Sequence, residues 1–259
     1  MSSKQQVESA AIVLNCRDHG ESDIIVTFFC QHLGRLTGIA KGAKRSKKRF
    51  VNKLEIFSSL RIRHTIPQNN RLAFIAEAEL LDGFLKLRQD ISCYTTASVI
   101  RELTLQATQE TEGDEELYPL LIWAFSSLNA GRPPHRALIF FLIRFFSIIG
   151  YGPQLENCLG CGKEIETTQS YSFLLSSGGI CCSGCAKESP TGGIRLSQGT
   201  LRSLSRAMLQ PLEQLNRLQL SGKSQQEALT FLHSYGRRLF QREIESWTFL
   251  RPVHQKNNY

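Results

Sequence analysis

Four cysteines have the residue type and spacing of a tetrahedral metal site. Cys158 and Cys161 form one C-x2-C pair, and after twenty further residues Cys182 and Cys185 form a second. Each pair makes a tight turn, and a folded insert brings the two turns together, as in a zinc ribbon. Two disulfides, two separate redox pairs and a chance arrangement are the alternatives. The two pairs reinforce each other, which favours a single Zn2+ site.

The predicted zinc is structural. Four protein thiolates fill every position of a tetrahedral ion and leave none open for water or substrate. Cys181 is a competing ligand candidate, but only Cys182 has the x2 spacing to Cys185. Three other cysteines stand alone in apolar surroundings, and we expect them to be small buried hydrophobic residues: Cys16, Cys30 and Cys93.

Length and composition indicate a cytoplasmic protein of two or three small domains. The chain has 259 residues, of which 41% are hydrophobic, a value that is ordinary for globular proteins. Its first residues lack the apolar core of a signal peptide. The most apolar stretch, residues 137–149, is short and interrupted by Arg144. We therefore expect neither secretion nor association with a membrane.

Positive charge is concentrated in one N-terminal segment. The net charge is +8, but residues 35–71 alone carry +10, because Glu55 is their one acid. The basic residues of this segment are Arg35, Lys41, Lys44, Arg45, Lys47, Lys48, Arg49, Lys53, Arg61, Arg63 and Arg71. Such a concentration suits the phosphate backbone of nucleic acid, and a solvated loop kept for solubility is the alternative.

The N-terminal part of the sequence predicts a small β-barrel. Short segments rich in Ile, Val, Phe and Thr alternate with turn residues, and we expect strands at 10–14, 23–29, 35–40, 53–63 and 71–80. Five strands without intervening helices fit an OB-fold, which commonly binds single strands through a positive groove and stacking aromatic rings. We expect Phe28, Phe29, Phe57 and Phe74 mainly in the core. Phe50, beside Arg49, is the stacking candidate.

The remainder has helical periodicity. We expect helices at 84–107, 117–128, 137–149, 197–209 and 225–240, with Ser197 as an N-cap. The overall expectation is an α+β protein with an N-terminal five-stranded OB-fold barrel (1–80), an α-helical domain (81–154 and 191–259) and a zinc-ribbon insert with four cysteine ligands (155–190). A phenylalanine-rich helix near 140–146 should lie at the centre of the helical domain.

No catalytic motif is recognisable. Gly222-Lys223-Ser224 lacks the upstream glycine of a phosphate-binding loop, because Arg217 stands at that position. His19-Gly20-Glu21 has the H-x-E of zinc deaminases, but those enzymes keep one zinc position open. We therefore expect a protein that is not an enzyme.

Two groups of motifs resemble the RecO family of bacterial recombination mediators. The first comprises Arg17, Gly20-Glu21, Asp23, Thr27, Gly34-Arg35, the stretch from Ala40 to Arg45, and Arg49-Phe50. The second comprises Gly150-Tyr151-Gly152-Pro153, Leu155, Cys158, Cys161-Gly162, Gly178-Gly179, Cys182 and Cys185. The likeness spans nearly the whole chain, and it implies the same three-part architecture.

This resemblance implies a role in DNA repair and recombination after DNA damage. A RecO-like protein of the RecF pathway binds single- and double-stranded DNA and anneals complementary strands. With RecR it helps RecA to load onto DNA coated by single-strand-binding protein, whose acidic tail it also binds. The resemblance further implies a bacterial, nucleoid-associated location.

The implied DNA-binding residues lie in or beside the basic segment. The resemblance assigns this role to Arg35, Lys41, Lys44, Arg45 and Arg49, and local charge adds Lys47 and Lys48. Two other classes stay open. A zinc-ribbon RNA-binding or translation accessory factor would also combine an OB-fold with a ribbon, and a metal-dependent enzyme would require an open zinc position.

Overall fold

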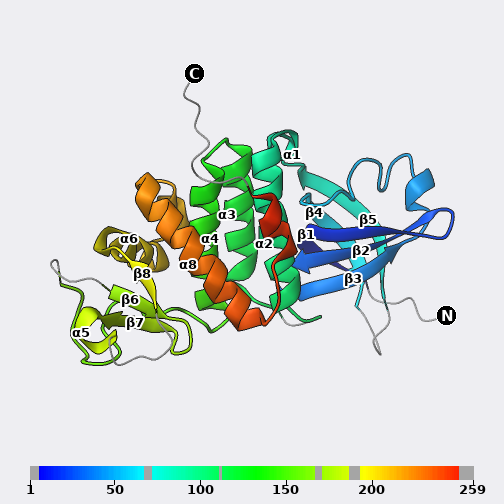
Figure 1. The fold of residues 1–259 in the computed structure, drawn as a ribbon. Helices are drawn as coiled ribbons and strands as arrows, with labels where there is room; N and C mark the ends of the chain where they lie inside the picture. Colours follow the sequence, from blue (N-terminus) through cyan, green and yellow to red (C-terminus); the bar gives the residue numbers. More distant parts are fainter. Residues whose placement is uncertain (1–5, 67–71, 111–112, 167–170, 187–192, 251–259) are drawn as a thin grey trace, which may run out of the picture.

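The N-terminal part of the chain folds into a closed β-barrel. The computed structural model describes residues 6–66, 72–110, 113–166, 171–186 and 193–250. The barrel strands follow the order β1-β2-β3-β5-β4 (Figure 1). Their bounds are β1 Gln6–His19, β2 Asp23–Cys30, β3 Gly34–Ala40, β4 Ser59–Thr65 and β5 Ala73–Asp82. This order confirms the expected OB-fold.

The barrel closes through its one parallel pairing among the described strands. β3 pairs with β5 at Gly38↔Ala73 and Ile39↔Phe74, and the other neighbouring strands are antiparallel. A Cβ on Gly38 would lie 2.5 Å from Ile75 Cδ1 and 2.9 Å from the Ala73 carbonyl oxygen. Closure therefore depends on a glycine at position 38, because any side chain would separate the two strands.

Two expected strands have different bounds in the structure. β1 continues far beyond residues 10–14, since it pairs with both β2 and β4. Residues 53–58 form turns, so the strand expected from residue 53 begins at Ser59. The cause is Phe57, whose positive φ of 75° directs the chain out of the strand while its ring is buried. Residues 67–71, which include Arg71 at the start of the last expected strand, lie outside the described residues.

The second part of the chain is mainly helical. Its helices are α1 Leu85–Gln89, α2 Ile91–Ala107, α3 Leu117–Asn129, α4 Pro134–Ile148, α6 Gln198–Leu209, α7 Leu212–Leu215 and α8 Gly222–Phe240, followed by the short 3-10 helix η2 Glu245–Phe249. The single helix expected at 84–107 is divided at Asp90, whose carboxylate accepts from the Cys93 amide and caps α2. Ser197 caps α6 by accepting from the Thr200 amide, as expected.

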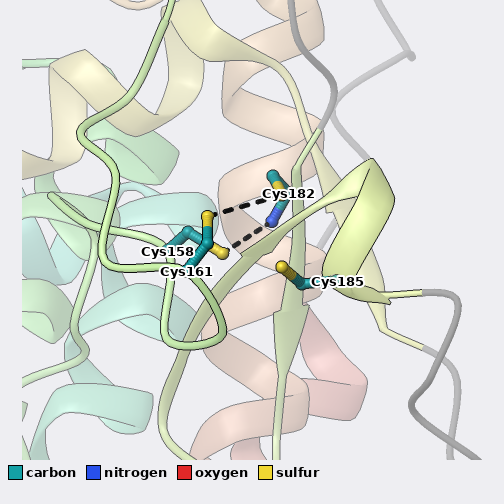
Figure 2. A group of neighbouring side chains, drawn as sticks. All are labelled: Cys158, Cys161, Cys182 and Cys185. Carbon is teal, nitrogen blue, oxygen red and sulfur yellow. Dashed lines mark hydrogen bonds between the residues drawn. The ribbon is translucent and has the colours of Figure 1, made fainter.

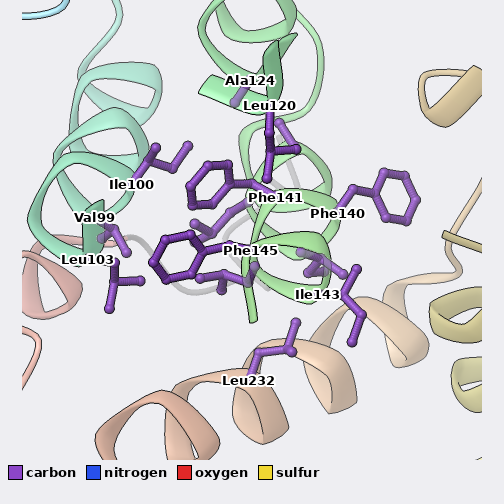
Figure 3. Close-up of a cluster of buried hydrophobic side chains, with 14 of the residues drawn as sticks. Val99, Ile100, Leu103, Leu120, Ala124, Phe140, Phe141, Ile143, Phe145 and Leu232 are labelled. Atoms are coloured by element: carbon purple, nitrogen blue, oxygen red, sulfur yellow. The ribbon is translucent and has the colours of Figure 1, made fainter. Parts of the chain in front are cut away.

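Helix α4 forms the centre of the helical part. Its phenylalanines at 140, 141, 145 and 146 are all buried, and the helix contacts α2, α3, α6 and α8. Figure 3 shows Phe141 and Phe145 facing Val99 and Ile100 of α2, with Leu232 of α8 nearby. Because α4 is apolar around nearly all of its circumference, it must be enclosed by other helices. The expectation of a buried central helix is confirmed.

Aromatic packing fixes the barrel against the helices. Phe57, which precedes β4, and Phe84, which follows β5, both contact Phe125 of α3, with ring centroids 5.3 and 6.0 Å apart. Both residues have positive φ, 75° and 45°, a conformation that costs roughly 1–2 kcal/mol outside glycine. Burial of the two rings offsets this cost, and the barrel is thereby held in one orientation.

A small sheet with the cysteine pairs interrupts the helical part between α4 and α6. It has the strand order β7-β6-β8, with β6 Tyr171–Leu174, β7 Gly179–Cys182 and β8 Ile194–Leu196, and α5 Ser183–Ala186 follows β7. Phe173 of β6 is buried and packs on Phe231 of α8, with ring centroids 4.4 Å apart. The insert therefore shares a hydrophobic core with the helices. None of the helices in the described ranges is long and apolar enough to cross a membrane.

Candidate metal centre and nucleic-acid interface

The first cysteine pair lies in a turn that its own backbone closes. The Cys158 amide donates to the Lys163 carbonyl, and the Gly162 amide donates to the Cys158 carbonyl, both at 2.8 Å. Gly162 adopts φ 72°, in the left-handed region that favours glycine. Gly160 faces the second pair so closely that a Cβ there would lie 2.7 Å from Cys185 Cβ. Glycines at both positions therefore let the turn approach the second pair.

The second cysteine pair lies where β7 ends and α5 begins. Cys182 is the last residue of β7, and Cys185 is in the single turn of α5. The Leu159 amide of the first turn donates to the Ile180 carbonyl of β7 at 2.8 Å. Because backbone hydrogen bonds join the two pairs, their positions do not depend on the thiol groups alone.

The structure brings the four sulfurs into one group. All four lie within 4.8 Å of one another, and Cys161 Sγ is 4.0 Å from Cys182 Sγ (Figure 2). Four sulfurs at about 2.3 Å from a tetrahedral ion would be about 3.8 Å apart. A disulfide would instead require about 2 Å, and the eight cysteines are free. The spacing fits one metal ion and does not fit disulfides.

Backbone amides also favour negative charge at this group. Burial by itself would raise the pKa of the Cys158 thiol, but amide donors at Cys182, Cys161 and Gly160 hold it at about 6. The Cys182 amide lies 3.2 Å from Cys158 Sγ. Hydrogen bonds among the sulfurs, first to Cys182, raise the pKa of Cys185 to about 12. The residues therefore suit a thiolate-bound metal ion, whose charge would stabilise all four thiolates.

Cys181 lies outside this group. Its side chain is buried with Cys158 and Leu174, and the four-residue group that could hold a metal contains Cys182 instead. Burial raises the pKa of the Cys181 thiol, and the neighbouring Cys158 raises it further. Of the isolated cysteines, Cys30 and Cys93 are buried and Cys16 is half-buried.

A basic loop, residues 41–49, follows β3 on the barrel. Its second residue, Gly42, adopts φ 66°, and the Gly42 amide donates to Asp23 Oδ1 at 2.8 Å. This hydrogen bond lowers the pKa of Asp23. The loop continues through the 3-10 turn η1 Ala43–Arg45, and Ser46 Oγ accepts from the amide of Arg49. The loop thus has a defined conformation that the barrel supports.

Three basic residues of the loop hold it to the barrel. Lys44 Nζ lies 3.0 Å from an Asp18 carboxylate oxygen and donates to the Gly20 carbonyl. Arg45 forms a longer ion pair with Glu21, 3.5 Å apart. The Arg49 guanidinium donates to the carbonyls of Lys41 and Ala76, at 3.3 and 3.4 Å. Their charges remain near the surface, but their side chains already form ion pairs or hydrogen bonds within the protein.

The other lysines of the loop point into solvent. Lys41, Lys47 and Lys48 are exposed, and within the described part of the chain their ammonium groups have no ion-pair partner. Of the basic side chains of the loop, these three should bind an anion at the lowest free-energy cost, because they have no ion pair within the described residues that binding would break.

The expected stacking role of Phe50 is wrong. Its ring is only 3% exposed and belongs to the barrel core with Leu36 and Leu54. The Arg49 guanidinium lies over this ring, 5.1 Å from its centroid. A base cannot stack on a ring that is covered on one side by arginine and on the other by the core. Phe28, Phe29 and Phe57 are buried as expected, and Phe74 is half-buried.

Arg35 lies apart from the basic loop. It is the second residue of β3, and its guanidinium donates to the Leu105 carbonyl of α2 at 3.0 Å. The structure therefore brings six of the seven expected DNA-binding residues together in one loop and places the seventh at the junction with the helices.

A second set of basic residues, dispersed in the sequence, lies together in the helical part. Arg202 and Arg206 on α6 and Arg217 before α8 line one cavity, and Arg136 donates to Gln219 of the same cavity at 2.8 Å. Their only sequence signal is the i, i+4 spacing of Arg202 and Arg206 on a helix without acids.

Comparison with known proteins agrees with this architecture. Residues 1–84 match the family model described as Recombination protein O N terminal, and residues 88–248 match Recombination protein O C terminal. Proteins named DNA repair protein RecO align over nearly their whole length. The chain is 28% identical to that of Syntrophus aciditrophicus (98% of this chain, 99% of the relative). It is 30% identical to that of Syntrophobacter fumaroxidans (94% and 96%) and 31% to that of Anaeromyxobacter sp. strain K (92% and 95%).

The fold and the cysteine group define an OB-barrel protein with a helical domain and a four-cysteine insert. The family matches cover almost all of the barrel and of the helical part. The chain belongs to the RecO family, and the resemblance expected from its motifs is confirmed.

Proposed function

We propose that this chain is a non-catalytic recombination mediator. It binds single- and double-stranded DNA, anneals complementary strands and, with RecR, helps RecA to load onto DNA coated by single-strand-binding protein. Its membership of a family whose relatives are named DNA repair proteins supports this role. The same relatives are bacterial, which supports a cytoplasmic, nucleoid-associated location. We further propose that the acidic tail of single-strand-binding protein docks on the helical domain.

The observation that carries the DNA-binding part is the exposed basic loop on an OB barrel. Lys41, Lys47 and Lys48 are exposed there and have no ion-pair partner among the described residues, and Lys44, Arg45 and Arg49 add positive potential around them. Contacts of this kind bind phosphates without reading base sequence. Arg35 extends this surface only if its hydrogen bond to Leu105 is exchanged for a phosphate contact.

We assign one structural zinc ion to Cys158, Cys161, Cys182 and Cys185. Sulfur ligands at tetrahedral spacing favour zinc over hard cations such as Mg2+. With four protein ligands the ion would have no open position, so it would stabilise the insert without taking part in chemistry. The domain division that we propose is a barrel (1–80), a helical domain (81–154 and 191–259) and a zinc insert (155–190).

A salt titration of DNA binding tests this proposal. Fluorescence anisotropy would measure the affinity for a labelled oligothymidylate as salt increases. Replacement of Lys41, Lys47 and Lys48 by Gln should reduce the slope of log K against log salt by about 2, since each single-strand phosphate contact contributes about 0.7. An unchanged slope would show that the loop does not bind DNA. Preference for structured RNA over DNA in competition would favour the alternative role, an RNA-binding or translation accessory factor.

A further inference from the structure

Five arginines from three segments of the helical domain converge on one face. We call Arg132, Arg136, Arg202, Arg206 and Arg217 the arginine face. Arg202 and Arg206 lie one turn apart on α6, and with Arg217 they line a cavity of about 710 Å3. The face also includes Arg136, through its hydrogen bond to Gln219 at the cavity.

The arginines of this face lack ion-pair partners in the part of the chain that the structure describes, although Glu213 of α7 lies four residues before Arg217. Helix α6 contains no acidic residue, and Arg202, Arg206 and Arg217 are exposed. In the described ranges, none of the five arginines forms an ion pair. Burial lowers the pKa of Arg136, and the positive charge of Arg132 lowers it further. Like charges held this close together raise the free energy of the unbound protein, so an anion that binds there relieves the repulsion.

The chemistry of the face fits a phosphate backbone. Guanidinium groups form paired hydrogen bonds with phosphate, and a DNA strand repeats its charge along its length. Leu218 is the one apolar side chain among the residues that line the cavity. An acidic protein segment would gain little there, because stable peptide docking depends on buried apolar or aromatic anchors. Nucleic acid does not need such anchors, so DNA is the occupant that the face favours.

The arginine face and the basic loop lie at opposite ends of the molecule. Figure 1 shows α6 at the end away from the barrel, with α2, α3 and α4 between them. One strand bound at the basic loop therefore leaves the arginine face free. A protein with two separate cationic surfaces can hold two strands at once and screen the repulsion between them.

We propose that the arginine face is a second DNA-binding surface that holds another strand while the basic loop holds the first. This proposal rests on the proposed DNA-binding function and adds the means by which one molecule could bring two strands together.

A bridging experiment tests the proposal. Oligothymidylate is attached to beads, and a second, fluorescent oligothymidylate is captured only if the full-length protein holds both, since the two cannot pair. The test variant is R202Q/R206Q/R217Q. The control K163Q/R238Q/R242Q removes the same charge from exposed positions on other surfaces of the molecule. Thermal melting establishes that both variants fold. The variant R202K/R206K/R217K keeps the positive charge, and it replaces the glutamine variant if the glutamine variant does not fold.

The proposal predicts that the test variant captures at least about tenfold less of the second strand than the control, while its affinity for one strand stays within about threefold of wild type. The lysine variant should retain most of the bridging. Equal capture by all variants would overturn the inference and leave the proposed function intact. If the wild type captured no DNA, the proposed function itself would fail. If the test variant lost its binding of a labelled poly-glutamate peptide while its bridging of two strands was unchanged, the face would instead be assigned to an acidic protein.

Discussion

The Arg35 guanidinium of β3 donates to the Leu105 carbonyl of α2 at 3.0 Å, across the junction of barrel and helices. A second bond runs in the opposite direction, from Arg101 of α2 to the Leu14 carbonyl of β1 at 3.1 Å. Together with the packing of Phe57 on Phe125, these bonds fix the barrel relative to the helical domain.

We predict that Arg35→Gln lowers the free energy of unfolding by about 1.5 kcal/mol, because a charged hydrogen bond to a half-buried carbonyl is lost. Denaturant unfolding measures this change. Anisotropy with an oligothymidylate should show a smaller loss of affinity than the variant of the three free lysines. If Arg35→Gln left stability unchanged and weakened DNA binding as strongly as that variant, Arg35 would be a DNA contact instead.

Gly160→Ala should weaken metal binding by roughly tenfold or more. The new Cβ would lie 2.7 Å from Cys185 Cβ and 2.8 Å from its sulfur, so the two cysteine pairs would have to move apart. Zinc competition with a chromophoric chelator measures the affinity. Gly184→Ala is the matched control, since the Cβ added there would lie 3.9 Å from Cys182 Sγ, an ordinary van der Waals distance. Equal affinity in both variants would contradict the geometry of the turn.

Zinc content distinguishes Cys181 from the four assigned ligands. Cys158→Ala should lose its metal and destabilise the insert, whereas Cys181→Ala should retain one zinc per chain, because its sulfur lies outside the four-sulfur group. Atomic absorption on purified protein measures the stoichiometry. Loss of zinc from Cys181→Ala with retention in Cys182→Ala would reverse the assignment.

Stability should fall as the pH decreases below about 6.5, the ordinary pKa of histidine. His64 is fully buried in the barrel, where Nε2 bonds Ser9 Oγ and Nδ1 bonds the Thr65 carbonyl. Burial lowers its pKa, only partly opposed by the Thr65 bond. The unfolded chain therefore binds a proton that the folded chain excludes, so stability is complete above the unfolded pKa and is lost toward the lower folded pKa.

The measurement for His64 is urea unfolding at a series of pH values. His64→Gln should reduce the pH dependence between about 7 and 5. It should not abolish the dependence, because burial, followed by Arg237, also lowers the pKa of His233. An identical pH dependence in the variant and the wild type would show that the fold does not lower the pKa of His64.

Local patterns predicted the elements that depend on neighbouring residues. The cap at Ser197 depends on a few consecutive residues, and the metal site depends on two short cysteine motifs. The structure places both as expected. Long-range packing was harder to predict. The position of Phe50 beside Arg49 predicts a stacking ring, because the sequence does not reveal which side of the loop faces the core, whereas the ring is buried.

The arginine face could not be predicted from the sequence. Its residues lie between positions 132 and 217, and only the packing of α4, α6 and the segment before α8 brings them together. The basic loop was predictable because its charges are consecutive. The orientation of Arg35 was not, since it depends on a carbonyl seventy residues away in the chain.

The most direct test of the central claim is the annealing of complementary strands that have first been coated with single-strand-binding protein. We predict that the wild-type chain anneals these coated strands and that the variant with Lys41, Lys47 and Lys48 replaced by Gln does so much more slowly. If the coat blocked annealing by the wild-type chain as completely as it blocks a generic basic protein, the chain would not be a recombination mediator.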